Sequence, residues 1–203
     1  MRRAILVATL ILTLGGTSAM AESLAGRLGI TGKAGAVVPL EDLISGTSDS
    51  KTAFALGGGI IFGISRSLAA EIDVTHVPEL DVEISGNKAY EASMTDVALG
   101  LQYRMASENR LVPFLGAGVD FIKGDLEHVS GANYDLKWTV GGHVNAGMDY
   151  FLNRGIAFTI DVRGLYAAKG DVESAGTKVG EYDPMSFIAT AGIRLVLPES
   201  ASW

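Results

Sequence analysis

The residues of this chain best suited to catalysis come closest together at His128-Val129-Ser130. A histidine and a serine two positions apart on one strand, with an acidic partner, can carry out nucleophilic hydrolysis. Here the pair falls between Gly124 and Gly131, in a segment with the composition of a loop. The geometry that such catalysis requires is therefore not expected, and the sequence predicts no enzyme activity.

The histidines are also candidate metal ligands, but His76, His128 and His143 are scattered and the chain contains no cysteine. Gly116-x-Gly118 is not a nucleotide-binding loop, because no helix is predicted after it. The net charge of −7 argues against nucleic acid as a partner, since nucleic-acid binding needs a basic surface. We therefore predict no metal, no cofactor and no nucleic acid.

A larger set of charged residues recurs at alternate positions within otherwise apolar segments, and acids and bases are nearly equal in number. The set consists of Arg27, Glu71, Asp73, Asp96, Arg104, Asp149, Asp161, Arg163 and Arg194. Isolated buried charges are very costly, whereas paired networks are tolerated. If the face they share is enclosed, these residues are predicted to form a plug of ion pairs, in which Asp161 and Arg163 share partners. His143 is expected to join them.

The segments that carry these charges alternate apolar and polar residues, which is typical of β-strands. Eight such runs follow one another along the chain. They cover 24–38, 52–64, 68–77, 90–105, 111–123, 136–151, 156–168 and 185–197. The third run continues in phase past Pro78 as far as Ile84. The pattern predicts an all-β fold.

Short and long connections alternate between these runs without exception. The short ones are 65–68, 106–110 and 152–155, and the long ones are 39–51, 78–89, 124–135 and 169–184. Outer-membrane barrels have this arrangement, with short periplasmic turns and longer external loops. Runs of these lengths also suit a tilted membrane crossing, which needs at least ~9–11 residues. We predict an eight-stranded antiparallel transmembrane β-barrel.

Alternation alone does not tell a membrane barrel from a soluble periplasmic barrel, because either one has a polar and an apolar face. The aromatic residues on the apolar face separate the two. Near the short turns lie Phe62, Tyr103, Tyr150 and Phe158, and near the long loops lie Phe54, Phe121, Trp138, Tyr166 and Phe187. Two aromatic girdles around an aliphatic band favour the lipid interface. The charged face is therefore expected to line the lumen.

The N-terminus has the parts of a secretory signal. Met1-Arg2-Arg3 is basic, Ala4 to Leu14 is apolar, and Ala19-Met20-Ala21 is a small-residue cleavage site. The apolar run is too short to span a bilayer as a helix, which needs ~20 residues. We predict that 1–21 is a signal peptide and that 22–203 is the barrel domain of a protein in the cell outer membrane.

Three segments resemble the OmpW family of small outer-membrane barrels. They are Gly35-Ala36-Val37-Val38-Pro39, Leu101-Gln102-Tyr103 followed by Pro113-Phe114-Leu115-Gly116-Ala117-Gly118-Val119, and Ala146-Gly147-Met148-Asp149-Tyr150 followed by Asn153 and Asp161-Val162-Arg163. The resemblance implies an eight-stranded barrel with a narrow apolar channel that serves passive uptake of small hydrophobic molecules. The chain departs from the family pattern in its C-terminal tail, which continues past the last strand to Trp203.

The external half of the lumen is predicted to differ from the charged half. Its inward residues are apolar and are expected to include Val37, Ala55, Val77, Ala92, Met94, Ile122, Leu165 and Ile188. Apolar sites with few polar groups suit hydrophobic ligands. A plug beneath this vestibule favours sideways exit through the wall. The glycine runs Gly57-Gly58-Gly59 and Gly141-Gly142 are the candidate weak points, although they can equally serve barrel curvature.

The predicted function is passive uptake of small hydrophobic molecules through the apolar vestibule with lateral exit. The alternative is a structural or adhesion barrel whose external loops bind partners without transport. The expected partners are outer-membrane lipids, lipopolysaccharide and small hydrophobic molecules. The barrel-assembly machinery is expected as well, because Thr190-x-Gly192-x-x-Leu195-x-Leu197 resembles its C-terminal signal.

Overall fold

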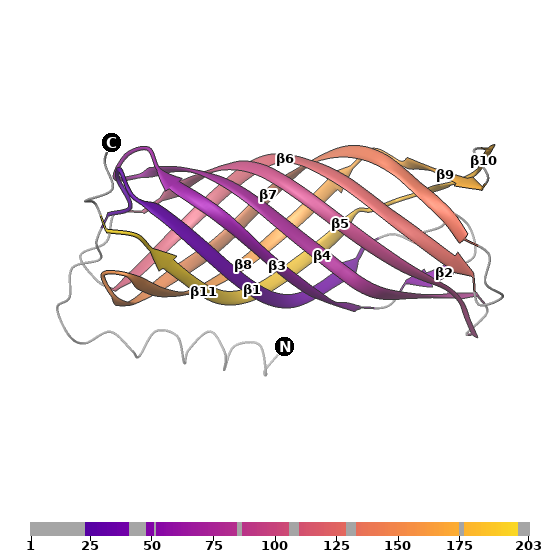
Figure 1. Ribbon diagram of the computed structural model, residues 1–203, viewed down its shortest axis with the longest axis horizontal. Coiled ribbons are helices and arrows are strands. Elements are labelled where there is room, and N and C mark those ends of the chain that lie inside the picture. Colours follow the sequence, from indigo (N-terminus) through magenta and orange to yellow (C-terminus); the bar gives the residue numbers. More distant parts are fainter. Residues whose placement is uncertain are drawn as a thin grey trace.

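Eight long strands form a closed antiparallel barrel in the computed structural model (Figure 1). The structure describes residues 23–40, 48–50, 52–84, 87–105, 110–128, 133–174 and 177–198. The barrel strands are β1 (Leu28–Pro39), β3 (Ala53–Gly63), β4 (Leu68–Ile84), β5 (Asn87–Arg104), β6 (Leu111–His128), β7 (Asn133–Asn153), β8 (Ile156–Ala167) and β11 (Ser186–Val196). The predicted fold class is confirmed. The predicted signal peptide lies outside the described residues.

The barrel closes because the first and last strands pair along their whole length. β1 and β11 are in antiparallel register from Gly29 opposite Val196 to Pro39 opposite Ser186. Consecutive strands pair elsewhere, and β8 completes the circuit between β7 and β11. A closed ladder satisfies backbone groups between strands, which is what a chain needs in lipid. Among the described residues, no helix is long and apolar enough to cross a membrane.

The two ends of the barrel differ in build. At one end the turns are short, as at 64–67 and 154–155. At the other end β4 to β7, with 17 to 21 residues each, extend beyond β1, β3, β8 and β11, which have 11 or 12. We call the short-turn end periplasmic and the other end external, following the rule for outer-membrane barrels.

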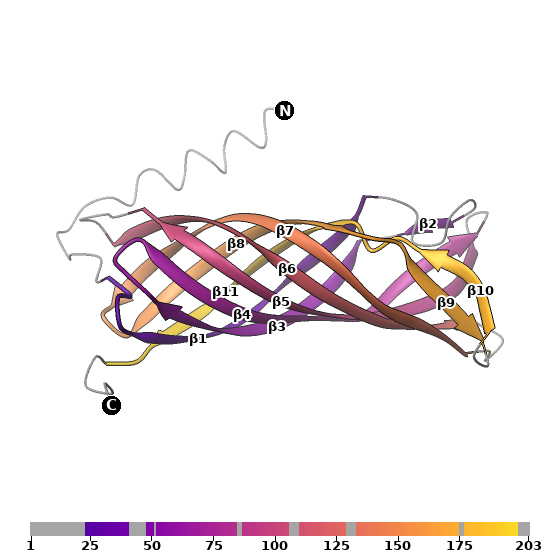
Figure 2. The ribbon, with the colours of Figure 1, turned by 90° about the horizontal axis from the view of Figure 1, so that it is seen from above.

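Three short strands lie at the external end, and none of them was predicted. β2 (Ser48–Ser50) pairs with β4, while β9 (Gly170–Ser174) and β10 (Thr177–Tyr182) form a hairpin that pairs with β7 (Figure 2). β4 ends at Ile84, as the continued alternation past Pro78 predicted, whereas β5, β6 and β7 run further than expected, into segments taken as loops from their polar composition. Continued cross-strand pairing, rather than hydrophobic alternation, sustains these extensions.

The outward face of the barrel is apolar over its whole girth. Large hydrophobic side chains on all eight barrel strands are exposed, among them Trp138 at 60% and Tyr166 at 70%. The predicted periplasmic aromatics Phe62, Tyr103 and Phe158 are exposed at the opposite end of the strands. An exposed apolar belt of this extent is far larger than a soluble monomer carries.

The start of β1 is a correction to the prediction, which began the strand at Leu24 with an outward side chain. The structure begins the strand at Leu28, and Leu24 is only 2% exposed. Gly26 has a φ of +70°, a conformation that glycine adopts without steric cost. This turn directs the segment before β1 away from the wall, so that Leu24 packs inside the periplasmic mouth.

Candidate functional site: the lumen

The lumen is filled by inward side chains in three layers. The external layer is an apolar cluster, which we call the vestibule. Charged and amide side chains occupy the middle. The periplasmic layer is a second apolar cluster, which we call the cap. Alternation along each strand positions all three, because every second side chain points inward.

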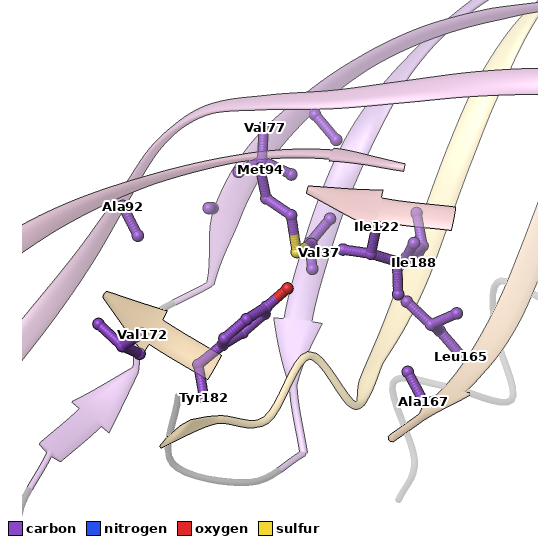
Figure 3. Packing of buried hydrophobic residues seen from close by; sticks show 12 residues of the cluster. Val37, Val77, Ala92, Met94, Ile122, Leu165, Ala167, Val172, Tyr182 and Ile188 are labelled. Carbon is purple, nitrogen blue, oxygen red and sulfur yellow. The ribbon is translucent and has the colours of Figure 1, made fainter. Parts of the chain in front are cut away.

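The vestibule contains all eight residues predicted for it. Its members are Val37, Ala53, Ala55, Val77, Ala92, Met94, Ile122, Leu165, Ala167, Val172, Tyr182 and Ile188. Ala53 and Ala167 extend the same inward faces of β3 and β8. Val172 and Tyr182 come from the unpredicted hairpin and lie with the strand residues in Figure 3. The structure brings these residues together in one cluster, and their role in ligand uptake stays a prediction.

The vestibule is closed from outside by the β9–β10 hairpin and the segment after it. Tyr182 is completely buried, and its hydroxyl donates a hydrogen bond of 2.8 Å to the carbonyl oxygen of Lys137. Asp183 is also buried and accepts a hydrogen bond from the amide of Met185 at 3.1 Å. Burial raises the pKa of Tyr182 to about 12. The sequence of 169–184 carries little signal for this hairpin, because its large apolar residues Val172, Val179 and Tyr182 do not recur at alternate positions.

The middle layer begins, on its periplasmic side, with a network around Asp149. Arg104 and Arg194 each lie 2.5 Å from the same Asp149 carboxylate oxygen. Arg194 also reaches Glu71 at 3.3 Å, and Glu71 accepts a hydrogen bond from Gln102 at 2.7 Å. Both guanidinium groups lie over the Phe114 ring, at 5.6 and 6.0 Å from its centroid. These charges are paired within the barrel, as buried charges must be.

A second network, which we call the central network, lies nearer the vestibule and is organised by Arg163. Its guanidinium reaches Asp73 at 3.4 Å, Asp96 at 3.5 Å and Asp120 at 4.0 Å. Lys33 binds Asp73 at 2.8 Å. The prediction did not place Lys33 and Asp120 in the plug, although both lie on inward strand faces.

His143 lies in this central network, 2.9 Å from Asp120 through Nδ1. It fits there because the facing wall positions are glycines: a Cβ at Gly118 would come within 2.6 Å of the imidazole. Asp161 accepts a 2.6 Å hydrogen bond from Asn145, which is not among the acids that Arg163 reaches.

Arg27 is placed differently from the other predicted plug residues. It lies at the periplasmic rim, where its guanidinium donates hydrogen bonds to the carbonyl oxygens of Leu197 and Arg154 at 3.0 and 2.8 Å. Arg27 keeps the inward phase that alternation assigned to it, since it is buried while the adjacent Leu28 is exposed, and it differs from the other members in its height along the barrel. The other eight predicted members lie in the middle layer.

The cap was missed by the sequence analysis, which expected polar side chains throughout the periplasmic half. It consists of Leu24, Ile61, Ala69, Val112, Phe151, Ala157 and Val196. Most of these residues lie on inward positions at the very ends of strands, where the alternation is hardest to assign. The lumen is thus closed on the periplasmic side by two successive layers, one apolar and one charged.

The wall is interrupted at the height of the vestibule, between β3 and β4. Within the fully described segment 52–84, pairing of these strands ends at Leu56 opposite His76. Above it, Ala53–Ala55 have no partner residue on β4 in the register. Pro78 lies at this place, inside a β-bulge between Val77 and Leu80, and proline lacks the amide that a ladder needs.

The glycine runs are not the interruption. Gly57, Gly58 and Gly59 pair with β1 on one side and with β4 on the other. Gly141 and Gly142 likewise pair with both β6 and β8. A Cβ at Gly59 would lie 2.8 Å from Asp73 Oδ2, so this glycine makes room for a lumen side chain. Space inside the barrel, rather than a weak wall, explains its presence.

The other candidate chemical groups do not gather into a site. His76 is exposed and lies 2.9 Å from the hydroxyl of Thr95 on the outer face. Of His128-Val129-Ser130, the last two residues lie outside the described part, and the side chain of His128 is not described. Across the described ranges, no group of three or more His, Cys, Asp or Glu side chains is arranged to hold a metal ion.

A closed eight-stranded barrel with an apolar outer belt and a charged lumen is the form of an outer-membrane protein. The family model described as "Outer membrane protein beta-barrel domain" matches residues 7–194. The chain belongs to this family. It is therefore a protein of the outer membrane, which confirms the predicted location.

Solved structures of outer-membrane proteins share this family member's fold. OprG from Pseudomonas aeruginosa is 18% identical, with a TM-score of 0.71 over 88% of this chain and 99% of that one. Neisserial surface protein A is 15% identical, with a TM-score of 0.60 over 84% and 97%. The outer-membrane protein AlkL is 22% identical, with a TM-score of 0.59 over 93% and 98%. No curated protein matches the sequence. At these identities the likeness concerns the fold alone.

Proposed function

We propose that this barrel is an OmpW-type protein that takes up small hydrophobic molecules passively and releases them sideways into the outer membrane. One observation carries the proposal: the apolar vestibule and the interruption between β3 and β4 lie at the same height. Ala53, Ala55 and Val77 belong to both. A molecule in the vestibule would therefore face lipid through a part of the wall that has no ladder to break.

The direct route to the periplasm is unfavourable for such a molecule. Beneath the vestibule it would meet the central network, the network around Asp149 and then the cap. Separating buried ion pairs leaves uncompensated charges, which costs several kcal/mol for each pair. An apolar solute has no charge or hydrogen-bonding group that could stabilise the separated charges. Sideways exit exchanges one apolar environment for another and avoids that cost.

The chemistry of the vestibule favours apolar solutes over polar ones. Its strand residues are aliphatic side chains and one methionine, and methionine adapts its shape to different occupants. Burial of apolar surface stabilises a bound molecule by about 25 cal/mol per Å². Nothing in the described vestibule would compensate a buried charge on the solute.

Placement within the OmpW group rests on the three segments that resemble it. The first ends β1 and contributes Val37 to the vestibule. The second includes Phe114, which lies against the Asp149 network, and the third contributes Asp149 and Arg163. The segments are thus inward-facing parts of the layers that the proposed function uses. We also propose lipids and lipopolysaccharide as partners of the outer belt, and the barrel-assembly machinery as partner during insertion.

The experiment is uptake of a hydrophobic dye by liposomes that contain the refolded barrel, after a heat-shift gel has shown folding. Leu165→Lys places a charge in the vestibule and is expected to abolish uptake. Val144→Leu, a conservative change at a lipid-facing position of β7 that is 68% exposed, is expected to leave uptake unchanged. A folded wild-type barrel without uptake would instead favour the alternative, a structural or adhesion barrel that works through its external loops.

A further inference from the structure

The Tyr182 side chain lies within the vestibule but does not come from a barrel strand. It comes from the end of β10, whereas the other side of the cluster comes from barrel strands. In Figure 3 its ring is directed toward Met94 and Val37, with Val172 behind it. Gly170, the cross-strand partner of Tyr182 in the hairpin, leaves room for the ring, because a Cβ at this position would overlap it. We call the space that the ring fills the slot, and its barrel side is formed by vestibule residues that are not part of the hairpin.

The polar end of the slot is a hydrogen-bond acceptor. The phenol hydroxyl donates to the Lys137 carbonyl oxygen, which is a backbone group of β7 and is present whatever fills the slot. A ring with a hydroxyl satisfies this acceptor, and an aliphatic chain without a donor does not. The bond is part-buried, so an occupant without a donor leaves this acceptor less well satisfied. The slot thus distinguishes a phenol from an alkane of the same area.

The hairpin that delivers Tyr182 is weakly attached to the barrel. Among the described residues, β9 pairs with β7 at two positions, Asp135 opposite Glu173 and Leu136 opposite Val172. One ion pair, Lys137 with Glu173 at 3.1 Å, adds to this attachment and is partly exposed. Lys178 binds Asp171 and Glu181 at 2.7 and 2.8 Å, but these contacts lie within the hairpin and do not tie it to the wall. Elements with few buried contacts open at low cost.

We propose that Tyr182 is a displaceable internal ligand of the vestibule and that the molecules which replace it are small phenols. This inference rests on the proposed function and names the substrate class of the same site. A phenol that enters takes the place of the Tyr182 ring in the cluster with Met94 and Val37 and donates the hydrogen bond to the Lys137 carbonyl oxygen, while the hairpin with Tyr182 moves outward. The internal ligand must leave before a phenol binds. The apparent affinity of the wild-type protein is therefore lower than that of an open vestibule, in proportion to the fraction of molecules that are open.

The test measures binding of p-cresol, which reproduces the tyrosine side chain, by calorimetry on the refolded full chain. Tyr182→Ala is expected to bind p-cresol at least about tenfold more tightly than wild type, since the closed state no longer competes. n-Hexanol, of similar size but not aromatic, should gain less. Tyr166→Ala is the matched control, because Tyr166 is a lipid-facing tyrosine of β8 that is 70% exposed.

A second variant guards against misfolding of the cavity mutant. Gly170→Ala displaces the Tyr182 ring without creating a cavity and should also raise p-cresol affinity. Gly180→Ala on the same hairpin is its control, because a Cβ there would lie 3.9 Å from the nearest atom, in ordinary contact. Equal p-cresol affinity in wild type, Tyr182→Ala and Gly170→Ala would overturn the inference, as would an equal gain for n-hexanol.

The two proposals fail in different ways. If Leu165→Lys abolishes hydrophobic uptake while the Tyr182 variants behave as wild type, the proposed uptake is supported and the proposal of an internal ligand is wrong. If p-cresol binds the Tyr182→Ala vestibule tightly but neither the wild type nor any variant shows uptake, the phenol site is supported and the proposed transport is wrong.

Discussion

The two ends of the lumen are both closed by apolar side chains, yet they are built differently. The cap is made by barrel strands and the segment that enters before β1, and it rests on ion pairs as short as 2.5 Å. The vestibule is closed by a hairpin that pairs with the barrel at two positions. The first closure can open only if the barrel changes, whereas the second can open while the barrel stays intact.

This difference indicates which boundary a solute can cross. At the external end the obstacle is one aromatic side chain on a weakly attached element. At the periplasmic end it is a continuous plug. The interruption of the wall lies on the external side of that plug. In the proposed function the plug would be the floor that directs a solute sideways, and each prediction below tests one part of this contrast.

The largest effect is expected from removing the acid that holds the periplasmic plug together. Asp149→Ala leaves Arg104 and Arg194 without their shared partner, which should cost about 3–5 kcal/mol of unfolding free energy. Glu173→Ala, which breaks the partly exposed pair with Lys137, should cost no more than about 1 kcal/mol. Urea unfolding in detergent, followed by tryptophan fluorescence, compares the two. Similar losses would show that the plug is not the stable end.

A matched pair of isoleucines separates stability from transport. Ile61 in the cap and Ile122 in the vestibule are both completely buried, so each substitution by alanine should cost about 2–5 kcal/mol. Only Ile122→Ala should change which solute sizes enter, because only Ile122 lines the route. Uptake of a size series of dyes by liposomes measures this. A changed size limit in Ile61→Ala would contradict the role of the cap as a closed floor.

A smaller effect is expected at the interruption of the wall. Pro78→Ala restores an amide donor on β4, which should extend the ladder with β3 and lower uptake several-fold while stability changes little. Pro113→Ala is the control, because Pro113 lies on β6 opposite Met148, in a continuously paired part of the wall. Equal uptake by the two variants would show that the solute leaves elsewhere.

The smallest effect concerns pH at the external closure. Burial raises the pKa of Tyr182 to about 12, so its neutral form favours the closed hairpin. Closure is unaffected below the ordinary tyrosine pKa of ~10 and weakens as pH rises from there toward 12. Difference absorbance titration of wild type against Tyr182→Phe should show one late-titrating phenol. Titration of that phenol near 10 would mean that the vestibule is open.

The sequence predicts the barrel well because alternation, turn lengths and aromatic girdles are all local patterns that share one cause, a strand between lipid and lumen. The vestibule was found for the same reason, since Val37, Met94 and Leu165 follow directly from strand phase. The partners of Arg163 could not be found in this way. They come from β4, β5 and β6. The barrel shear that brings them to one height cannot be deduced from the sequence of any single strand.

Local exceptions to the pattern account for what was missed. The turn at Gly26 moves Leu24 off the outward face that alternation assigned to it. Tyr182 reaches the vestibule through a hairpin that begins in a predicted loop. The glycine runs suggested a weak wall, whereas the interruption lies where pairing of β3 with β4 ends, beside a bulge at Pro78 in the pairing of β4 with β5.

The most direct test of sideways exit is to close the interruption and reopen it in the same protein. The chain has no cysteine, so Ala55→Cys with Val77→Cys gives a single pair of thiols across the gap. A short cross-linker attached through disulfides can join them, and a reductant removes it. Gly57→Cys with Thr75→Cys, a paired position on the same strands, is the control. The account predicts that uptake of a hydrophobic dye stops on cross-linking and returns on reduction in the first pair only. Uptake that continues through the cross-linked gap would contradict it.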